Sequence, residues 1–191
     1  MGRKALIESD ALIARLSDLF REAGFEGATL ARLSDATGLK RPSLYHRFPG
    51  GKEQMACEVL DEAGRWLTAN VLKPLAAEGS PRARIGAMIR QLDAFYRGGK
   101  QACLLNLLSA PVGETGPFQS RIAAMFEAFI AAIAAVVEDA GIAPAEARHR
   151  AQRAVAMIQG SLVLARGLGR TGPFRDALEE LPDLLLGTHA S

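Results

Sequence analysis

The segment that decides the fold is 29–52, which reads TLARLSDATGLKRPSLYHRFPGGK. Thr29 has a side chain that can cap the start of a short helix, and Gly38 is a residue that commonly ends one. Pro42 then stands in the first turn of another short helix, where its missing N–H costs nothing. Two short helices separated by a tight turn predict a helix-turn-helix.

The second of these helices has two chemically different sides. At about 100° per residue, Leu44 and Phe48 fall together and point inward. The opposite side carries Pro42, Ser43, Tyr45 and His46. A helix that only filled a core would not expose these polar groups, whereas a helix that contacts base edges and phosphates would. The pattern therefore predicts a DNA recognition helix.

Positive charge gathers at the same place. Lys40, Arg41 and Arg47 lie between 38 and 51 without an acidic residue among them, and Lys52 follows. The formal net charge of the whole chain is only +2, which disfavours a protein that coats nucleic acid through bulk charge. We therefore expect a local DNA-binding patch.

Apolar residues recur at helical spacing along the rest of the chain, and strand patterns are missing from it. This pattern predicts helices over 5–23, from 52 to a stop at Pro74, over 81–97 and 102–109, over 117–140 and 144–168, and from 173 onward with an interruption at Pro182. The residues 110–116 are predicted to form a loop. The prediction is an all-α fold of about nine helices, with a helix-turn-helix head over 1–52 and a body over 53–191.

Cysteine usage and apolar runs bound the environment of the chain. Its two cysteines, Cys57 and Cys103, are far apart, and it opens without a signal-peptide pattern, which favours a reduced, cytoplasmic protein. The most apolar run, 122–137, contains Glu127 and falls short of the roughly 20 residues that a membrane span needs. We expect a core or interface helix there rather than a membrane helix.

The segment 44–53, LYHRFPGGKE, strongly resembles the hallmark of the tetracycline-repressor (TetR) family. The resemblance is close over 11–59 and extends to the all-helical layout and the length of the whole chain. The two glycines before Lys52 resemble a branch of the family that controls drug-resistance and efflux genes. The resemblance implies a transcriptional regulator, usually a repressor, that acts without a cofactor.

The resemblance also implies DNA contacts at named positions. Thr29 matches a residue that caps the second helix and contacts a phosphate, and Lys52 matches a phosphate contact. Lys40 stands where the family commonly has serine or threonine, and we include it in the patch. The recognition helix itself matches the family at Arg41, Ser43, Tyr45 and His46, whose counterparts contact bases or the DNA backbone.

A regulator with one short recognition helix needs a second copy to bind a palindromic operator. In the resembled family the last two long helices form the dimer interface, and here these are 144–168 and 173–186. The face expected there carries Val155, Ile158, Leu162 and Ala165, with the small residues Ala151 and Gly160. The alternative is that this face is buried within one subunit. The run 184–186, Leu-Leu-Leu, favours a dimer because it needs cover.

The family places an effector pocket among the middle helices. The candidate pocket residues in this sequence are Trp66, Met88, Phe95, Asn106, Met125, Phe126, Phe129 and Gln159. Apolar walls with a few polar groups suit a small lipophilic or aromatic effector. Its binding would move the fourth helix like a lever and release the operator. The alternative is that these side chains simply form the core.

Three other functions are weighed against this one. An enzyme is disfavoured, because no catalytic motif and no metal-ligand spacing appear. A redox sensor would use Cys103 as a thiol activated by Lys100, although a cysteine beside Leu104 is more often a small buried hydrophobe. A helical adaptor would bind protein instead of DNA, and its DNA affinity would not depend on Tyr45 or His46.

Overall fold

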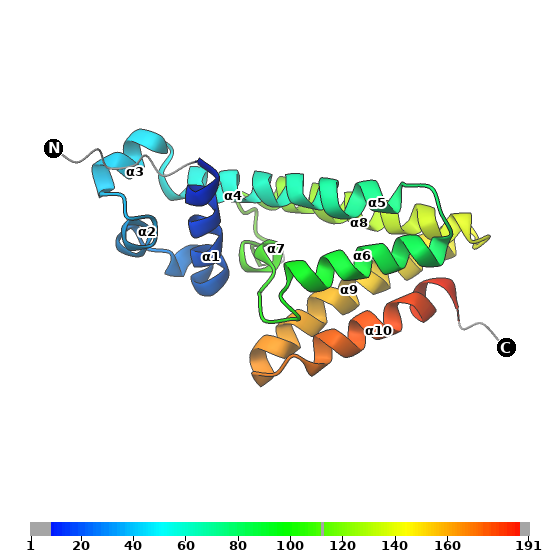
Figure 1. Cartoon of the computed structure of the whole chain (residues 1–191). Coiled ribbons are helices and arrows are strands. Elements are labelled where there is room, and N and C mark those ends of the chain that lie inside the picture. The colour runs from blue at the N-terminus through cyan, green and yellow to red at the C-terminus, as the bar shows by residue number, and fades with distance from the viewer. Residues whose placement is uncertain (1–8, 112, 188–191) are drawn as a thin grey trace.

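The computed structural model describes residues 9–111 and 113–187, and these form helices, turns and bends without a strand. Figure 1 shows a head of short helices at one end and the long helices of a body extending away from it. The all-α prediction is confirmed. Within the described residues the helices number nine, as predicted, when the continuous segment from Gly51 to Leu75 is counted once.

The head consists of α1 (Ser9–Gly27), α2 (Leu30–Thr37) and α3 (Arg41–Arg47). The predicted start of the first helix, 5–8, lies outside the described residues. The helix breaks at Gly24 as predicted, where φ is 68°, but a further turn follows and ends at Gly27. Both predicted ends of α2 are confirmed: Thr29 accepts a hydrogen bond from the Arg32 amide at 3.4 Å, and Gly38 has a left-handed φ of 70°.

The short helices of the head are held by burial of one apolar side chain after another. Leu16 and Phe20 of α1, Leu33 of α2 and Leu44 of α3 are fully buried, together with Phe48. The predicted inward pair of the recognition helix is thus confirmed. Each such side chain contributes about 1.5–3 kcal/mol when it leaves water, which a helix of seven or eight residues needs because short helices are marginal alone.

The core of the head does not stop at residue 52. The first half of α4 (Gly51–Leu67) belongs to it. So do side chains from much later in the chain: Leu104, Leu108, Phe118 and Ile122. Head and body therefore meet in one packed junction, and a movement of α4 changes the packing of both.

The predicted stop of the fourth helix near Pro74 is confirmed, because the helix ends one residue later, at Leu75. Before that end, however, it is not a regular α-helix throughout. It continues through a π-helical turn, η1 (Thr68–Leu72), into α5 (Lys73–Leu75). In η1 the Lys73 amide donates to the carbonyl of Thr68, five residues back. A wider turn lets the chain pass a proline, because it relieves the contact between the ring and the preceding turn. The result is one long rod that begins in the head and runs the length of the body (Figure 1).

The rest of the body is built from five helices: α6 (Pro81–Phe95), α7 (Leu104–Leu107), α8 (Gln119–Asp139), α9 (Pro144–Leu168) and α10 (Gly172–Leu186). The range predicted for α9 is confirmed. Pro182 lies inside α10, which continues across it instead of being interrupted there. α6 ends earlier than predicted because Arg97, Gly98 and Gly99 all have positive φ angles, which a right-handed helix excludes. α7 is shorter than predicted, since Cys103 before it is extended.

The apolar helix α8 packs against α9 in the body with one of its sides. It is long and apolar enough to pass as a membrane span, with a mean hydropathy of 1.8. Its large side chains Phe129, Ile133, Val136 and Val137 are buried in the body core, however. The residues that it leaves exposed are alanines and polar or charged residues. This agrees with the expected core helix.

The face of α9 that was expected to form a dimer interface is instead buried in its own subunit. Ile158 is fully buried, and Val155, Leu162 and Ala165 are about 5% exposed or less. Ala151 is fully buried too, whereas Gly160 is exposed. The prediction chose the wrong side because helical spacing identifies an apolar stripe but not the surface that covers it.

Candidate nucleic-acid interface and ligand cavity

The recognition helix α3 presents polar side chains to solvent. Tyr45 is 46% exposed, which makes it one of the few large apolar side chains on the described surface. Its neighbours on that surface are Lys40, Arg41, Ser43 and His46, all of them exposed. Thr29, at the start of α2, is exposed as well. Six of the seven predicted DNA contacts therefore stand where a duplex could reach them.

The turn between α2 and α3 is held by hydrogen bonds from two buried or half-buried hydroxyls. Thr37 donates to the carbonyl of Leu33 at 2.7 Å, and its own oxygen accepts from the Leu39 amide at 3.3 Å. Ser34 donates to the carbonyl of Leu39. These bonds satisfy backbone groups that the turn would otherwise leave unpaired. They fix the direction in which α3 leaves the turn.

Two of the four positively charged side chains of this region, Arg47 and Lys52, make contacts within the protein. Arg47 pairs with Glu58 of α4 through two contacts, at 2.9 and 3.3 Å, and lies over the Phe48 ring. Lys52, predicted to contact a phosphate, instead donates from Nζ to the carbonyl of Phe25 at 2.9 Å, with Glu26 at 3.7 Å. The reason is that α4 starts beside the end of α1, where a carbonyl, a carboxylate and the Phe25 ring face are within reach.

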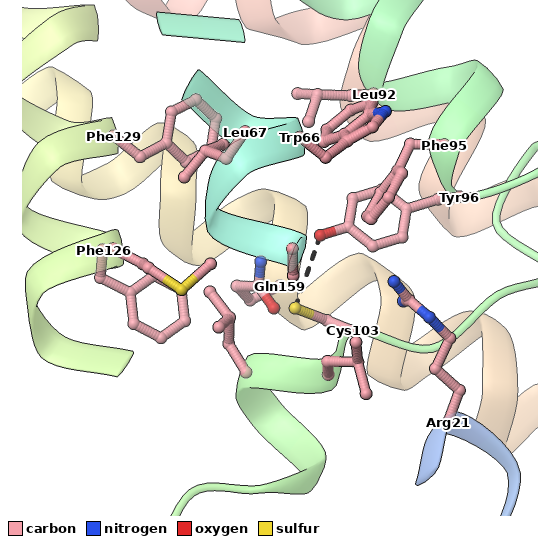
Figure 2. A pocket seen from close by; sticks show the side chains of 14 residues that line it. Arg21, Trp66, Leu67, Leu92, Phe95, Tyr96, Cys103, Phe126, Phe129 and Gln159 are labelled. Carbon is pink, nitrogen blue, oxygen red and sulfur yellow. Dashed lines mark hydrogen bonds between the residues drawn. The ribbon is translucent and has the colours of Figure 1, made fainter. Parts of the chain in front are cut away.

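A small, partly enclosed cavity of about 40 Å³ lies where the body meets the head. Figure 2 shows Trp66, Phe95, Phe126 and Phe129 around it, from three different helices. Trp66 and Phe95 stack with their ring centroids 3.8 Å apart. Six of the eight predicted effector contacts line the cavity: Trp66, Phe95, Met125, Phe126, Phe129 and Gln159.

The other two predicted contacts do not line it. Met88 is fully buried in the body core, and Asn106 is exposed on the surface of α7. Asn106 belongs to a helix of a single turn whose inward side is taken by Leu104. A polar side chain on the other side of that turn faces water.

Four polar groups border the cavity, and three of them were not assigned to it by sequence reasoning. Tyr96 donates from its hydroxyl to Cys103 Sγ at 3.4 Å. Burial raises the pKa of Tyr96 well above its usual range, so the phenol stays protonated. Arg21 reaches the cavity from α1, and Gln159 reaches it from α9. Lys100, proposed as the activator of Cys103, is exposed and does not line the cavity.

Arg21 is the residue that sequence reasoning missed most clearly. It lies one turn after Ser17 and two turns after Ile13, on a partly apolar line of α1. An arginine that continues such a line is a signal that its charge is directed to an interior group. Only the fold shows that this group is the wall of the cavity.

The opposite side of α9 from the body core is apolar and exposed. Val163, Leu164 and Leu168 are each more than half exposed. Gly160 and Gly167 lie on the same side of the helix, and a Cβ added to either would meet nothing within 4 Å. These five residues define the α9 outer face.

Comparisons with known proteins agree with this geometry. Residues 12–59 match the family model described as "Bacterial regulatory proteins, tetR family". Residues 81–180 match the model described as "Transcriptional regulator LmrA/YxaF-like, C-terminal domain". These two matched segments correspond to the head with the start of α4, and to most of the body.

Relatives and solved structures cover nearly the whole chain. An HTH-type transcriptional regulator of Mycobacterium tuberculosis (strain ATCC 25618 / H37Rv) is 30% identical over 195 residues, which cover 96% of this chain and 94% of that one. The HTH-type transcriptional regulator LmrA of Bacillus subtilis (strain 168) is 22% identical over 184 residues, 92% and 95% of the two chains.

Among solved structures, a TetR transcriptional regulator from Legionella pneumophila superposes with a TM-score of 0.80 at 19% identity, over 95% of this chain and 99% of that one. A cysteine mutant of the TetR-family regulator CifR, solved with 26-bp double-strand operator DNA, superposes with a TM-score of 0.72 at 22% identity, over 94% and 98%. The chain belongs to the TetR family: it is a transcriptional regulator with a helix-turn-helix DNA-binding domain, and not an enzyme.

Proposed function

We propose that the protein is a ligand-responsive repressor, which binds a palindromic operator as a homodimer and releases it when a small lipophilic or aromatic effector enters the cavity. The regulator acts where its DNA is, so we place it in the cytoplasm. The observation that carries the proposal is the position of the cavity. Its wall includes Trp66 near the end of α4 and Arg21 of α1, so the head itself forms part of the binding site.

This position gives an effector a direct mechanical route to the DNA. An occupant that separates the Trp66–Phe95 stack would shift α4 against α6. The first half of α4 carries the head core through Met55 and Val59. A ligand that binds the shifted arrangement better than the resting one moves the population toward it. The two recognition helices would then no longer fit half-sites about one helical turn apart.

The DNA contacts that we propose are the exposed side chains of the head. Arg41 and Lys40 supply charge, while Ser43, Tyr45 and His46 supply hydrogen-bonding groups, and Thr29 stands at the start of α2. In the free protein Lys52 is occupied by Phe25 and Glu26. We therefore assign Lys52 first to bracing the corner between α1 and α4, and to a phosphate only after that contact is exchanged.

The homodimer that we propose uses the α9 outer face. Three half-exposed aliphatic side chains next to two glycines suit close approach of a second, symmetry-related helix. α10 lies beside α9 and packs on it through Phe174, Leu178 and Leu181. The predicted pair of helices thus remains our proposal, with the opposite side of α9 as the contact surface.

The test begins by selecting DNA that the full-length protein binds from a random-sequence library. A palindromic consensus with half-sites about one helical turn apart is the expected result. Fluorescence anisotropy on that site then compares Arg41→Gln with Arg170→Gln, an exposed arginine near the end of α9. Losing one phosphate contact in Arg41→Gln should lower the steepness of the plot of log affinity against log salt concentration by about one. Arg170→Gln should leave this slope unchanged.

The repressor proposal makes two further demands on the same assay. Tyr45→Phe removes one hydroxyl from the α3 surface and should weaken binding by about three- to tenfold, which corresponds to one hydrogen bond. A panel of small aromatic compounds should contain at least one that dissociates the complex. If no compound weakens it, or if the selected DNA lacks symmetry, the corresponding half of the proposal is wrong.

The redox alternative is tested alongside. Cys103 is 5% exposed and its sulfur accepts a hydrogen bond from Tyr96, so an oxidant would reach it only through the cavity. If a mild oxidant releases DNA from the wild type but not from Cys103→Ser, the sensor is a thiol. Equal responses of the two proteins leave effector binding as the trigger.

A further inference from the structure

Arg21 is a buried cation whose partners are all uncharged. It is 8% exposed. Its Nη1 donates to the carbonyl of Ala102 at 2.6 Å, and its Nε donates to Ser17 Oγ at 3.4 Å. The guanidinium lies over the Phe95 ring, 4.8 Å from the centroid. Among the described residues no carboxylate lies within ion-pair distance of it, although Asp18 attracts it from farther away.

A buried charge without a counterion is unfavourable, and proteins normally pair it. Burial lowers the pKa of Arg21, but an arginine in a protein keeps its proton. The hydrogen bonds among the described residues leave Nη2 without a protein acceptor, and this atom still reaches solvent. In Figure 2 the guanidinium stands beside Tyr96 at the edge of the cavity. This leaves a place for an anion that the protein itself does not fill.

Two other polar groups of the cavity also lack a strong partner. Gln159 Oε1 is buried and has no hydrogen-bond partner. Tyr96 donates only to a sulfur, which is a weak acceptor. A carboxylate could accept from Arg21 and from a reoriented Tyr96. A hydroxyl or N–H elsewhere on the same molecule could donate to Gln159. Trp66 and Phe95 stack on each other, and a planar ligand that separates the pair would gain an aromatic face on each side.

We propose that the effector is a planar aromatic carboxylate that also carries a hydrogen-bond donor, with its anionic group at Arg21 and its donor at Gln159. This rests on the proposed function and narrows it, because a lipophilic effector in general need not be charged. A bidentate contact between a carboxylate and a guanidinium is among the strongest polar contacts that a protein makes. The ligand's negative charge would also attract α1 directly, because Arg21 belongs to that helix.

The experiment compares two probes of nearly equal shape, 6-hydroxy-2-naphthoate and its neutral counterpart 6-hydroxy-2-naphthamide. Isothermal titration calorimetry on the full-length protein measures their affinities. We expect the carboxylate to bind about tenfold or more tightly than the amide. Arg21→Gln should remove that difference by weakening the carboxylate alone. Lys100→Gln removes an exposed positive charge of the same region and serves as the control.

A second pair of probes tests the donor. 2-Naphthoate lacks the hydroxyl, so it should bind to the wild type less tightly than 6-hydroxy-2-naphthoate does. The two compounds should bind to Gln159→Leu with equal affinity. Unchanged binding of the amide to Arg21→Gln shows that the variant is folded. If Arg21→Gln loses the binding of the amide as well, Arg21→Lys is measured, because it retains the positive charge. A preference of Arg21→Lys for the carboxylate over the amide supports the proposal, and the absence of that preference overturns it.

Other outcomes separate this inference from the proposed function. Equal affinities of the carboxylate and the amide for the wild type overturn the anion site, even if both release the operator. Binding of neither probe overturns it too. A carboxylate that binds at Arg21 but leaves the operator complex intact supports the anion site and refutes the effector role of the cavity.

Discussion

Leu164→Ala should weaken the homodimer and leave the subunit folded. Leu164 is 55% exposed, so about half of its surface remains to be buried by a partner. Full burial of a leucine side chain is worth about 1.5–3 kcal/mol, so the remaining half is worth roughly 1 kcal/mol. A symmetric interface contains the residue twice. The loss is then about 2 kcal/mol per dimer, or about 30-fold in the dimer dissociation constant.

Leu162→Ala is the matched control, two positions away on the same helix. Leu162 is 4% exposed and packs in the body core. Its truncation should lower the free energy of unfolding by about 2–5 kcal/mol. It should leave the dissociation constant of the folded dimer nearly unchanged. The two substitutions are chemically identical, so the comparison isolates the side of α9 that faces the partner.

Sedimentation velocity with fluorescence detection, at nanomolar to micromolar protein, measures the dissociation constant, and circular dichroism measures thermal unfolding. The two variants are expected to give opposite results. If Leu162→Ala dissociates the dimer while Leu164→Ala does not, the partner contacts the stripe that the sequence suggested, and the subunit packing described above is wrong. A wild type that is monomeric throughout refutes the homodimer itself.

Two further predictions concern the stability of the subunit. Gly99 has φ 87°, and a Cβ added there would lie 2.8 Å from Phe174 Cβ, so Gly99→Ala should cost about 3 kcal/mol through backbone strain and overlap; a melting temperature equal to that of the wild type contradicts this. Because burial raises the pKa of Tyr96, its neutral form stabilises the fold below the unfolded-state pKa of about 10, and this contribution is lost as the pH rises through the higher folded value. In Tyr45→Phe, where Tyr96 is the remaining tyrosine, tyrosinate absorbance should therefore appear only together with unfolding, and its appearance in folded protein opposes the assignment.

The helix-turn-helix head and most of the helix boundaries could be predicted from the sequence. Leu44 and Phe48 recur at helical spacing, so they could be assigned to the core, and Thr29 and Gly38 could be recognised as caps because capping depends on neighbouring residues only. The range of α9 was predictable for the same reason. These features are local, because each depends on the chemistry of a few neighbouring residues.

The features that the sequence did not reveal depend on contacts between residues that are far apart in the chain. The end of the fourth helix near Pro74 was predictable, but the π-helical turn that precedes it was not. Leu162 and Leu164 are equally apolar, and only the packing of α8 and α10 against α9 decides which one is buried. Arg21 and Gln159 are separated by most of the chain, and the cavity that both of them line exists only after folding. A sequence pattern specifies which side chains share a face, whereas the packing of all the helices determines what that face contacts.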